Sequence, residues 1–242
     1  MHEKLHVDAV IFDKDGTLMD FDAFWVTLSR IALTDVVRSL HQPDALADTM
    51  LEVFGVKDGK ADINGILCKG TYQEMAHAVQ QVLQEHGCPV EDTLIENMVL
   101  DAYNRNAHLG AVEPACTDLR GVLVMLKNQG KKIALVTTDN APITRMCQDR
   151  LGISDQFDAV YTDDGALPPK PDPAAAMDLC RRMELAPDRV VMVGDTMTDV
   201  RFARNGGLKA VAVTGHAERK LQLAQHADVV LHDVSELINI LD

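Results

Sequence analysis

Acidic, hydroxyl and basic side chains follow several stretches of this sequence that have the apolar character of β-strands. Asp13 and Asp15 come directly after the apolar run that ends at Phe12. Further polar residues follow later strand-like runs, namely Thr137, Thr138, Lys170 and Asp195. If the strands are parallel, their carboxyl ends meet at one edge of a sheet, where ligands of such proteins bind. The spacing therefore predicts a single site made of acids, hydroxyls and one cation.

The two acids at the end of the first strand indicate a metal site or an acid–base function. Alternation along an extended chain would place Asp13 and Asp15 on the same side if the strand continued that far. Carboxylates side by side repel each other, and a shared metal ion or a proton relieves this repulsion. The simpler interpretation is a strand that is followed by an Asp/Gly turn.

The complete set of residues fits phosphoryl transfer. A carboxylate can attack phosphorus and form an aspartyl-phosphate, which divides the reaction into two easier steps. A hard cation such as Mg²⁺ takes carboxylate and water ligands. Lys170, hydroxyls and backbone N–H groups can offset the charge of the transferred group. A second carboxylate can protonate the leaving group and then activate water.

Each of these residues also has a purely structural interpretation. Thr137 is a type of residue that commonly caps a helix or stands in a turn, and Lys170 lies in a proline-rich loop where it could simply be solvated. Thr196 and Asp199 have the spacing of a capping box, which would satisfy the first turn of a helix. The sequence alone leaves these alternatives open, although independent turns would rarely place three acids and a lysine at one edge.

The composition limits the classes of partner. The chain has 242 residues, of which 47% are apolar, and a formal net charge of −14. This charge argues against binding to nucleic acid or to an anionic membrane through bulk electrostatics. Five cysteines without a C-x-x-C pair indicate reduced thiols rather than disulfides or a zinc site. The sequence has neither an apolar run of about 18 residues nor a signal peptide, so a cytoplasmic location is expected.

The order of the predicted elements indicates an α/β fold with an insertion. Leu5–Phe12 has the pattern of a buried strand, and strands alternate with helices from Glu113 onward. This alternation predicts a Rossmann-like parallel sheet with helices on both faces. Between Phe21 and His108 the helical periodicity continues without a convincing strand, which predicts an inserted all-helical subdomain. The expected domains are an α/β core of residues 1–18 and 113–242 and a helical cap of residues 19–112.

Four motifs resemble those of the haloacid dehalogenase superfamily of aspartate-nucleophile phosphohydrolases. In order, they are Phe12-Asp13-Lys14-Asp15-Gly16-Thr17-Leu18, the strand-end Thr137, Lys170-Pro171-Asp172-Pro173 and Gly194-Asp195-Thr196-Met197-Thr198-Asp199. Their order and spacing match the family, and the resemblance extends over essentially the whole chain. The helical block resembles the cap of the subgroup that contains phosphoglycolate phosphatases, pyrophosphatases and β-phosphoglucomutases.

The resemblance implies a role for each acid of the motifs. Asp13 would be the nucleophile and a metal ligand. Asp15 would be the general acid and base, and it would also offer its backbone carbonyl oxygen to the metal. Asp195 would be a direct Mg²⁺ ligand, and Asp199 would orient the water shell of the metal or Lys170. The second aspartate and the metal ligand favour a phosphohydrolase over a dehalogenase.

The resemblance also implies how the phosphoryl group is held. Lys170 would neutralise the phosphoryl group and the nucleophile, and Thr137 with Thr138 would bind the phosphoryl oxygens. Two residues depart from the subgroup pattern: Lys14 stands where an apolar or aromatic side chain is more common, and Thr138 replaces an asparagine. Both departures concern the substrate more than the reaction. Other candidates for substrate specificity are basic residues of the cap, namely Lys69, Arg105 and His108.

The sequence therefore predicts a Mg²⁺-dependent phosphatase that forms an aspartyl-phosphate on Asp13. Its partner would be a small phosphorylated metabolite, either phosphoglycolate-like or a sugar phosphate. A phosphosugar mutase of the β-phosphoglucomutase type is the alternative enzyme, and a non-catalytic phospho-acceptor or binding module is an alternative of another class. A monomer and a homodimer both remain open. A dinucleotide site is not expected, because no G-x-G-x-x-G follows the first strand.

Overall fold

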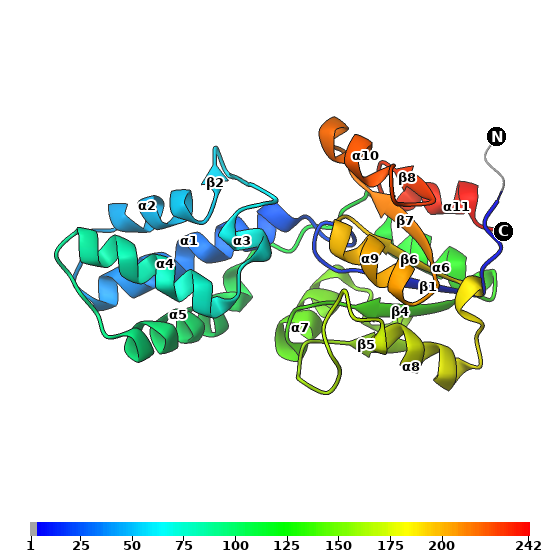
Figure 1. Ribbon diagram of the computed structural model, residues 1–242, viewed down its shortest axis with the longest axis horizontal. Coiled ribbons are helices and arrows are strands. Elements are labelled where there is room, and N and C mark those ends of the chain that lie inside the picture. The colour runs from blue at the N-terminus through cyan, green and yellow to red at the C-terminus, as the bar shows by residue number, and fades with distance from the viewer. Residues whose placement is uncertain (1–3) are drawn as a thin grey trace. The chain divides into compact units, whose positions relative to one another are not determined.

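The computed structural model describes residues 4–242, which form two compact units (Figure 1). The core unit combines the chain up to Asp20 with Val112–Asp242, and the helical unit is Phe21–Ala111. Within residues 4–242, no helix has the length and apolar character needed to cross a membrane.

A six-stranded sheet, in the order β5-β4-β1-β6-β7-β8, is the centre of the core unit. Its strands are β1 (Ala9–Phe12), β4 (Lys132–Val136), β5 (Ala159–Tyr161), β6 (Val190–Gly194), β7 (Lys209–Val213) and β8 (Val229–Leu231). All neighbouring strands are parallel, and Phe12 lies opposite Leu135 and Val193. The carboxyl ends of β1, β4 and β6 therefore lie at one edge, as the α/β prediction requires.

The first strand is shorter than the sequence predicts. Its neighbours β4 and β6 begin opposite Ala9, so the residues before Ala9 have no strand beside them on either side. Leu5 instead forms an isolated bridge with Leu241. The apolar pattern of Leu5–Phe12 thus begins before the residues that pair with neighbouring strands.

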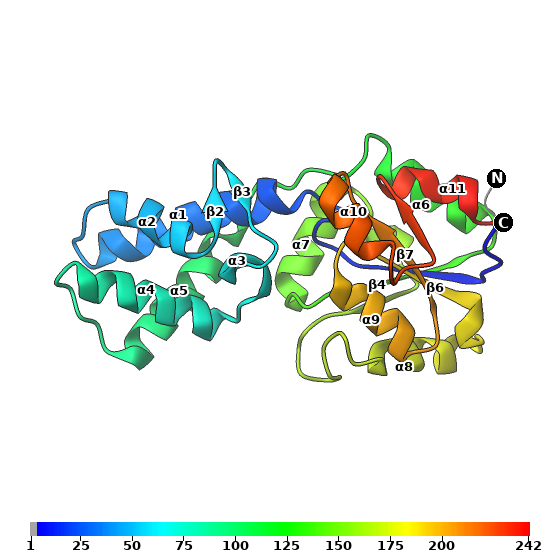
Figure 2. The same cartoon turned by 45° about the horizontal axis from the view of Figure 1, so that its top comes forward.

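Helices cover both faces of the sheet, and alternate residues of each strand pack against opposite layers. The core-unit helices are α6 (Leu119–Asn128), α7 (Ala141–Leu151), α8 (Ala174–Met183), α9 (Met197–Asn205), α10 (Ala217–Leu223) and α11 (Leu237–Ile240), with 3₁₀ turns at Ser154–Gln156, Pro187–Arg189 and Val234–Glu236. Phe12 packs with residues of α6 and α11, whereas Ile11 packs with residues of α8 and α9. Figure 2 shows these two pairs of helices on opposite sides of the sheet.

The helical unit is built around amphipathic helices. Its helices are α1 (Thr27–Ser39), α2 (Ala45–Val53), α3 (Ile66–Lys69), α4 (Tyr72–Glu85) and α5 (Asp92–Asn106), with a π-helical turn at Asp22–Val26 and a 3₁₀ turn at Ala107–Leu109. Helix α4 begins where the sequence predicts, because the Thr71 side chain accepts a hydrogen bond from the Glu74 N–H and Glu74 returns one. It ends before Gly87, whose φ of 76° suits a glycine.

A short hairpin in the helical unit corrects the prediction that this block has no strand. Strands β2 (Val56–Lys57) and β3 (Lys60–Ala61) pair in antiparallel fashion. Asp58 and Gly59, which connect them, have φ values of 50° and 75°. An Asp-Gly pair is the preferred connection of two-residue hairpins because both positions need a positive φ. The dipeptide was the available signal, and the strands were missed because each has only two residues.

Candidate active site

The loop after β1 brings its acids to the edge of the sheet. The Asp13 N–H still donates to the Val193 carbonyl at 2.9 Å, so Asp13 extends the ladder of β1. The chain then turns at Gly16, where φ is 78°. A Cβ atom at this position would lie 2.4 Å from Asp195 Oδ2. Glycine is therefore needed both for the left-handed backbone and for the close approach of the loop to Asp195.

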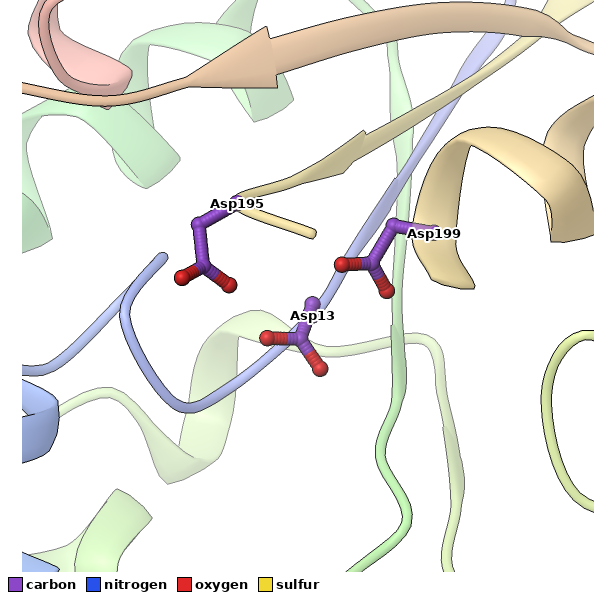
Figure 3. A group of neighbouring side chains, drawn as sticks. All are labelled: Asp13, Asp195 and Asp199. Atoms are coloured by element: carbon purple, nitrogen blue, oxygen red, sulfur yellow. The ribbon is translucent and has the colours of Figure 1, made fainter. Parts of the chain in front are cut away.

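Three buried acids gather at this edge (Figure 3). Asp13 follows β1, Asp195 follows β6, and Asp199 lies in the first turn of α9. Each offers one carboxylate oxygen, and these oxygens all lie within 4.8 Å of one another. Asp195 Oδ1 is buried and has no hydrogen-bond partner among residues 4–242. A buried, unpartnered carboxylate oxygen beside two further carboxylates is a donor set that fits a hard divalent cation.

Lys170 connects two of these acids. Its Nζ atom donates to Asp13 Oδ1 at 2.5 Å and to Asp199 Oδ1 at 2.7 Å. The side chain is buried, so the interpretation of Lys170 as a solvated loop lysine is wrong. Burial opposes the charge of Lys170, but the two carboxylates outweigh this effect and raise its pKa above the ordinary value. Lys170 with Asp13, Asp195 and Asp199 is termed the Lys170 cluster below.

Burial and mutual repulsion disfavour the ionised forms of the acids in this cluster. Burial raises the pKa of Asp13 to about 7; Lys170 opposes this rise, and Asp199 adds to it. Burial likewise raises the pKa of Asp195 well above its usual range, and the neighbouring Asp13 and Asp199 contribute. Arg219, in α10, provides a second positive charge, with Nη1 at 3.6 Å from Asp195 Oδ2. Additional positive charge at this point would favour the ionised acids.

Asp199 makes both the capping contact and the contact with Lys170 that the sequence left open. Its backbone N–H and carboxylate form a capping box with Thr196 at the start of α9. Its other carboxylate oxygen accepts from Lys170. A Cβ atom on Gly194 would lie 2.3 Å from the Asp199 side chain, so glycine at the end of β6 makes room for this carboxylate.

A second buried lysine, Lys14, lies in the loop after β1. Lys14 Nζ donates to Asp15 Oδ1 at 2.7 Å and lies 3.2 Å from Asp139 Oδ2. Burial lowers the pKa of Lys14, but Asp15 and Asp139 reverse this effect and raise it above the ordinary value. Burial raises the pKa of Asp139 to about 6, against the effect of Lys14. Lys14, Asp15 and Asp139 are termed the Lys14 cluster.

The residues after β4 divide between buried and exposed positions. Thr137 is buried, its N–H donates to the Tyr161 carbonyl, and its hydroxyl oxygen accepts from the Asp139 N–H at 3.2 Å. Thr138 is exposed. Asn140, not Thr137, caps α7 by accepting from the Ile143 N–H. Of the two structural interpretations of Thr137, the helix cap is wrong and the turn residue is confirmed, while its hydroxyl hydrogen stays available to a ligand.

The three basic residues suggested for specificity make contacts within the helical unit. Lys69 Nζ donates to Asn64 Oδ1 at 2.6 Å, and Arg105 pairs with Asp35 at 2.6 Å. The His108 ring lies 3.0 Å from the Arg105 carbonyl oxygen. All three side chains are exposed.

Sequence reasoning missed two charged residues of the site. Asp139 was part of a recognised strand end but received no role, although its position two residues after Thr137 was a usable signal. Arg219 follows β7 after a short loop. Its only signal was that β7 ends at the same edge of the sheet as β6, which becomes visible when the strand order is known.

Comparison with known proteins decides the family. A model of the family described as "Hydrolase: haloacid dehalogenase-like hydrolase" matches residues 7–207. The chain belongs to this family. A pyrophosphatase PpaX from Bacillus mycoides is 33% identical to it, with 98% of each chain covered. A phosphoglycolate phosphatase from Nitrosococcus oceani is 24% identical over 97% of this chain and 96% of the relative.

The solved structures agree with this assignment at the level of the fold. A subfamily IA hydrolase of the haloacid dehalogenase superfamily from Geobacter sulfurreducens has a TM-score of 0.68 at 16% identity, with 99% of each chain covered. The superfamily predicted from the motifs is confirmed, and so is the α/β fold with an inserted, mainly helical unit that the order of the elements predicts. The prediction of an enzyme is confirmed as well, since the chain is a member of a hydrolase family.

Proposed function

We propose that the protein is a Mg²⁺-dependent phosphatase that hydrolyses a small phosphomonoester through an aspartyl-phosphate on Asp13. The observation that carries this proposal is the Lys170 cluster, in which one lysine bridges Asp13 and Asp199 beside an unpartnered oxygen of Asp195. Several curated relatives are named phosphatases, which supports the same reaction class.

The metal would be held by the carboxylates of Asp13 and Asp195 and by the backbone carbonyl oxygen of Asp15, with Asp199 orienting its water ligands. A bound Mg²⁺ would supply positive charge that offsets the negative charge of the transferred phosphoryl group. Carboxylate and carbonyl oxygens are hard ligands, which Mg²⁺ prefers, whereas soft transition metals prefer sulfur ligands.

In the first half-reaction, a carboxylate oxygen of Asp13 attacks phosphorus and the ester P–O bond breaks. The leaving oxygen takes a proton from the carboxyl group of Asp15 and departs as an alcohol. Lys170 keeps the attacking carboxylate ionised and offsets charge on the phosphoryl oxygens. The Thr137 hydroxyl, whose oxygen already accepts from Asp139, donates its hydrogen to one of these oxygens.

In the second half-reaction, Asp15 is a carboxylate and accepts a proton from water. The water oxygen attacks phosphorus, the bond from phosphorus to Asp13 breaks, and inorganic phosphate leaves. Asp15 is protonated again and Asp13 is again a carboxylate, so the enzyme is regenerated.

The substrate class that we propose is a small phosphorylated metabolite, either phosphoglycolate-like or a sugar phosphate. The net charge of −14 leaves the local cations Lys170 and Arg219 as the groups that attract an anionic substrate. The relatives named above act, by their names, on phosphoglycolate and on pyrophosphate.

A phosphate-release assay over a panel of small phosphomonoesters, with Mg²⁺ and with a chelator, tests this function. We expect Mg²⁺-dependent release of phosphate that the Asp13→Asn substitution abolishes while the protein remains folded. Substantial Mg²⁺-dependent activity in that variant would overturn the mechanism. Isomerised sugar phosphate in place of phosphate would indicate a mutase, and a phosphoenzyme stable for hours would indicate a phospho-acceptor.

A further inference from the structure

We propose that Lys14, held in place by Asp139, is a positioning residue that fixes the carboxylate of Asp15 for proton transfer. This inference rests on the proposed function, because it concerns the residue that would move the proton in both half-reactions. It gives a role to the lysine between the two aspartates of the first motif.

The position of the Lys14 ammonium group is the first support. The side chain of Lys14 is only 2% exposed, whereas that of Asp15 is 17% exposed. Lys14 therefore lies on the protein side of Asp15, and Asp15 lies closer to solvent. From this position Lys14 can hold the carboxylate of Asp15. To contact a substrate directly, Lys14 would first have to break its ion pairs with Asp15 and Asp139.

Asp139 provides the fixed end of this arrangement. Its Oδ1 atom accepts from the Asn140 N–H at 2.8 Å, so its Oδ2 atom is turned to Lys14 at 3.2 Å. Its own N–H donates to the Thr137 hydroxyl oxygen. Lys14 thereby links the loop after β1 to the loop after β4, two neighbouring strands of the sheet.

Two sulfur-containing side chains also lie near the Lys14 ammonium group. Its Nζ atom lies 3.8 Å from Met19 Sδ, and the buried Cys147 of α7 is close enough for an electrostatic effect on it. A thioether and a thiol do not replace a carboxylate as a partner of an ammonium group. Two acids thus lie against the cation, and one of them is Asp15.

The consequence for catalysis is geometric. A general acid has to be within hydrogen-bond reach of the leaving oxygen, and a misplacement of 1 Å can reduce the rate by about 100-fold. Binding Oδ1 of Asp15 to a fixed ammonium group restricts rotation of the carboxylate. Removal of Lys14 should therefore slow the steps in which Asp15 gives or takes a proton. A step in which the leaving group departs without a proton should change little.

Rapid-mixing kinetics with p-nitrophenyl phosphate separate these steps. Its leaving group departs as an anion and needs no proton, so formation of the phosphoenzyme is seen as a burst of p-nitrophenolate. Hydrolysis of the phosphoenzyme needs Asp15 as a base. In Lys14→Met we expect a burst close to that of the unmodified protein, followed by a steady state about 100-fold slower, with phosphoenzyme accumulating. Asp15→Asn should give the same pattern.

Lys131→Met is the matched control. Lys131 is another buried lysine of the core unit, but its Nζ atom donates to the backbone carbonyl oxygens of Val7 and Asp242. This variant should retain both the burst and the steady-state rate. If Lys14→Met does not fold, the double variant Lys14→Met/Asp139→Asn removes both buried charges and is tested in the same way.

Two results would overturn the positioning role. One is an equal loss of the burst rate and the steady-state rate in the folded Lys14 variant, which indicates a merely structural residue. The other is a steady-state rate that does not change. By contrast, a failure of the unmodified protein to release p-nitrophenolate or phosphate counts against the proposed function itself, and the two failures are therefore distinguishable.

Discussion

The Lys170 cluster and the Lys14 cluster use the same residue types in different proportions. In each, a buried lysine bridges two carboxylates that follow strands of one sheet. The Lys170 cluster contains a third acid, Asp195, and one oxygen of this acid has no hydrogen-bond partner among the described residues. In the Lys14 cluster, Asp139 Oδ2 also has no hydrogen bond within residues 4–242, but it forms an ion pair with Lys14 at 3.2 Å, and the Asn140 N–H binds Oδ1.

This difference shows how similar groups acquire different functions. With Arg219 at 3.6 Å from Asp195, the Lys170 cluster has the same formal charge as the Lys14 cluster, but its three acids offer oxygens within 4.8 Å of one another and therefore favour a further cation. In the Lys14 cluster both acids lie against the same lysine, and this arrangement favours a fixed geometry. We therefore assign metal and phosphoryl chemistry to the first cluster and support of Asp15 to the second.

The largest effect is expected from Lys170→Met. Loss of this cation leaves three buried carboxylates together, and breaking a buried pair in this way costs about 3–5 kcal/mol. Urea unfolding without metal should show a loss of this size, part of which Mg²⁺ should restore. The turnover of p-nitrophenyl phosphate should fall by about 100-fold or more. Unchanged stability would contradict the view that Lys170 balances the acids.

Asp195→Asn should act in the opposite direction on the metal-free protein. It removes one of the buried like charges, so the free energy of unfolding without metal should rise by about 1–2 kcal/mol. The variant should also lose the stabilisation that Mg²⁺ gives to the unmodified protein. Thermal unfolding with and without Mg²⁺ measures both effects, and Asp139→Asn, in the other cluster, is the control that keeps the Mg²⁺ response. An equal Mg²⁺ response in Asp195→Asn would exclude this residue as a ligand.

Asp139→Asn should have a smaller effect than Lys14→Met. The substitution removes the anchor of Lys14 but leaves its contact with Asp15, so we expect the steady-state rate to fall by about 10-fold rather than 100-fold. The burst of p-nitrophenolate should remain. A loss larger than that of Lys14→Met would show that Asp139 acts on the reaction by a route other than Lys14.

The smallest effect is expected from Arg105→Ala in the helical unit. Its ion pair with Asp35 is exposed, and pairs of this kind contribute about 1 kcal/mol or less. The Mg²⁺ response and kcat should not change. Substrate titration measures KM in the same experiment, and a clear rise in KM with unchanged stability would make Arg105 a specificity residue, as the sequence suggested.

Much of the core unit could be predicted because strand and helix signals there are local. Apolar runs that end in polar residues mark β1, β4 and β6, and Asn140 and Thr196 mark the helices that follow two of these strands. The hairpin of the helical unit was harder, because two residues in each strand give no detectable alternation. The start of the first strand was also misjudged, since the ladder depends on where the neighbouring strands begin.

The residues of the site could be predicted from the sequence, but not which of them form ion pairs with one another. Strand ends in a parallel sheet share an edge, so the sequence by itself determined that Asp13, Lys170 and Asp195 would meet. It did not determine their partners, because an ion pair depends on atomic positions that elements far apart in the chain supply. Lys170 reaches Asp13 across 157 positions of the sequence.

Tertiary structure alone decided the separate partners of the two aspartates that flank Lys14. Alternation along a strand would keep Asp13 and Asp15 together, but the strand ends at Phe12 and the chain turns at Gly16. Asp13 then faces the acids that follow β6, whereas Asp15 is held by Lys14, which also faces Asp139 after β4. The residue types determined which chemistry was possible, and the packing of β1 between β4 and β6 decided which groups each of the two aspartates contacts.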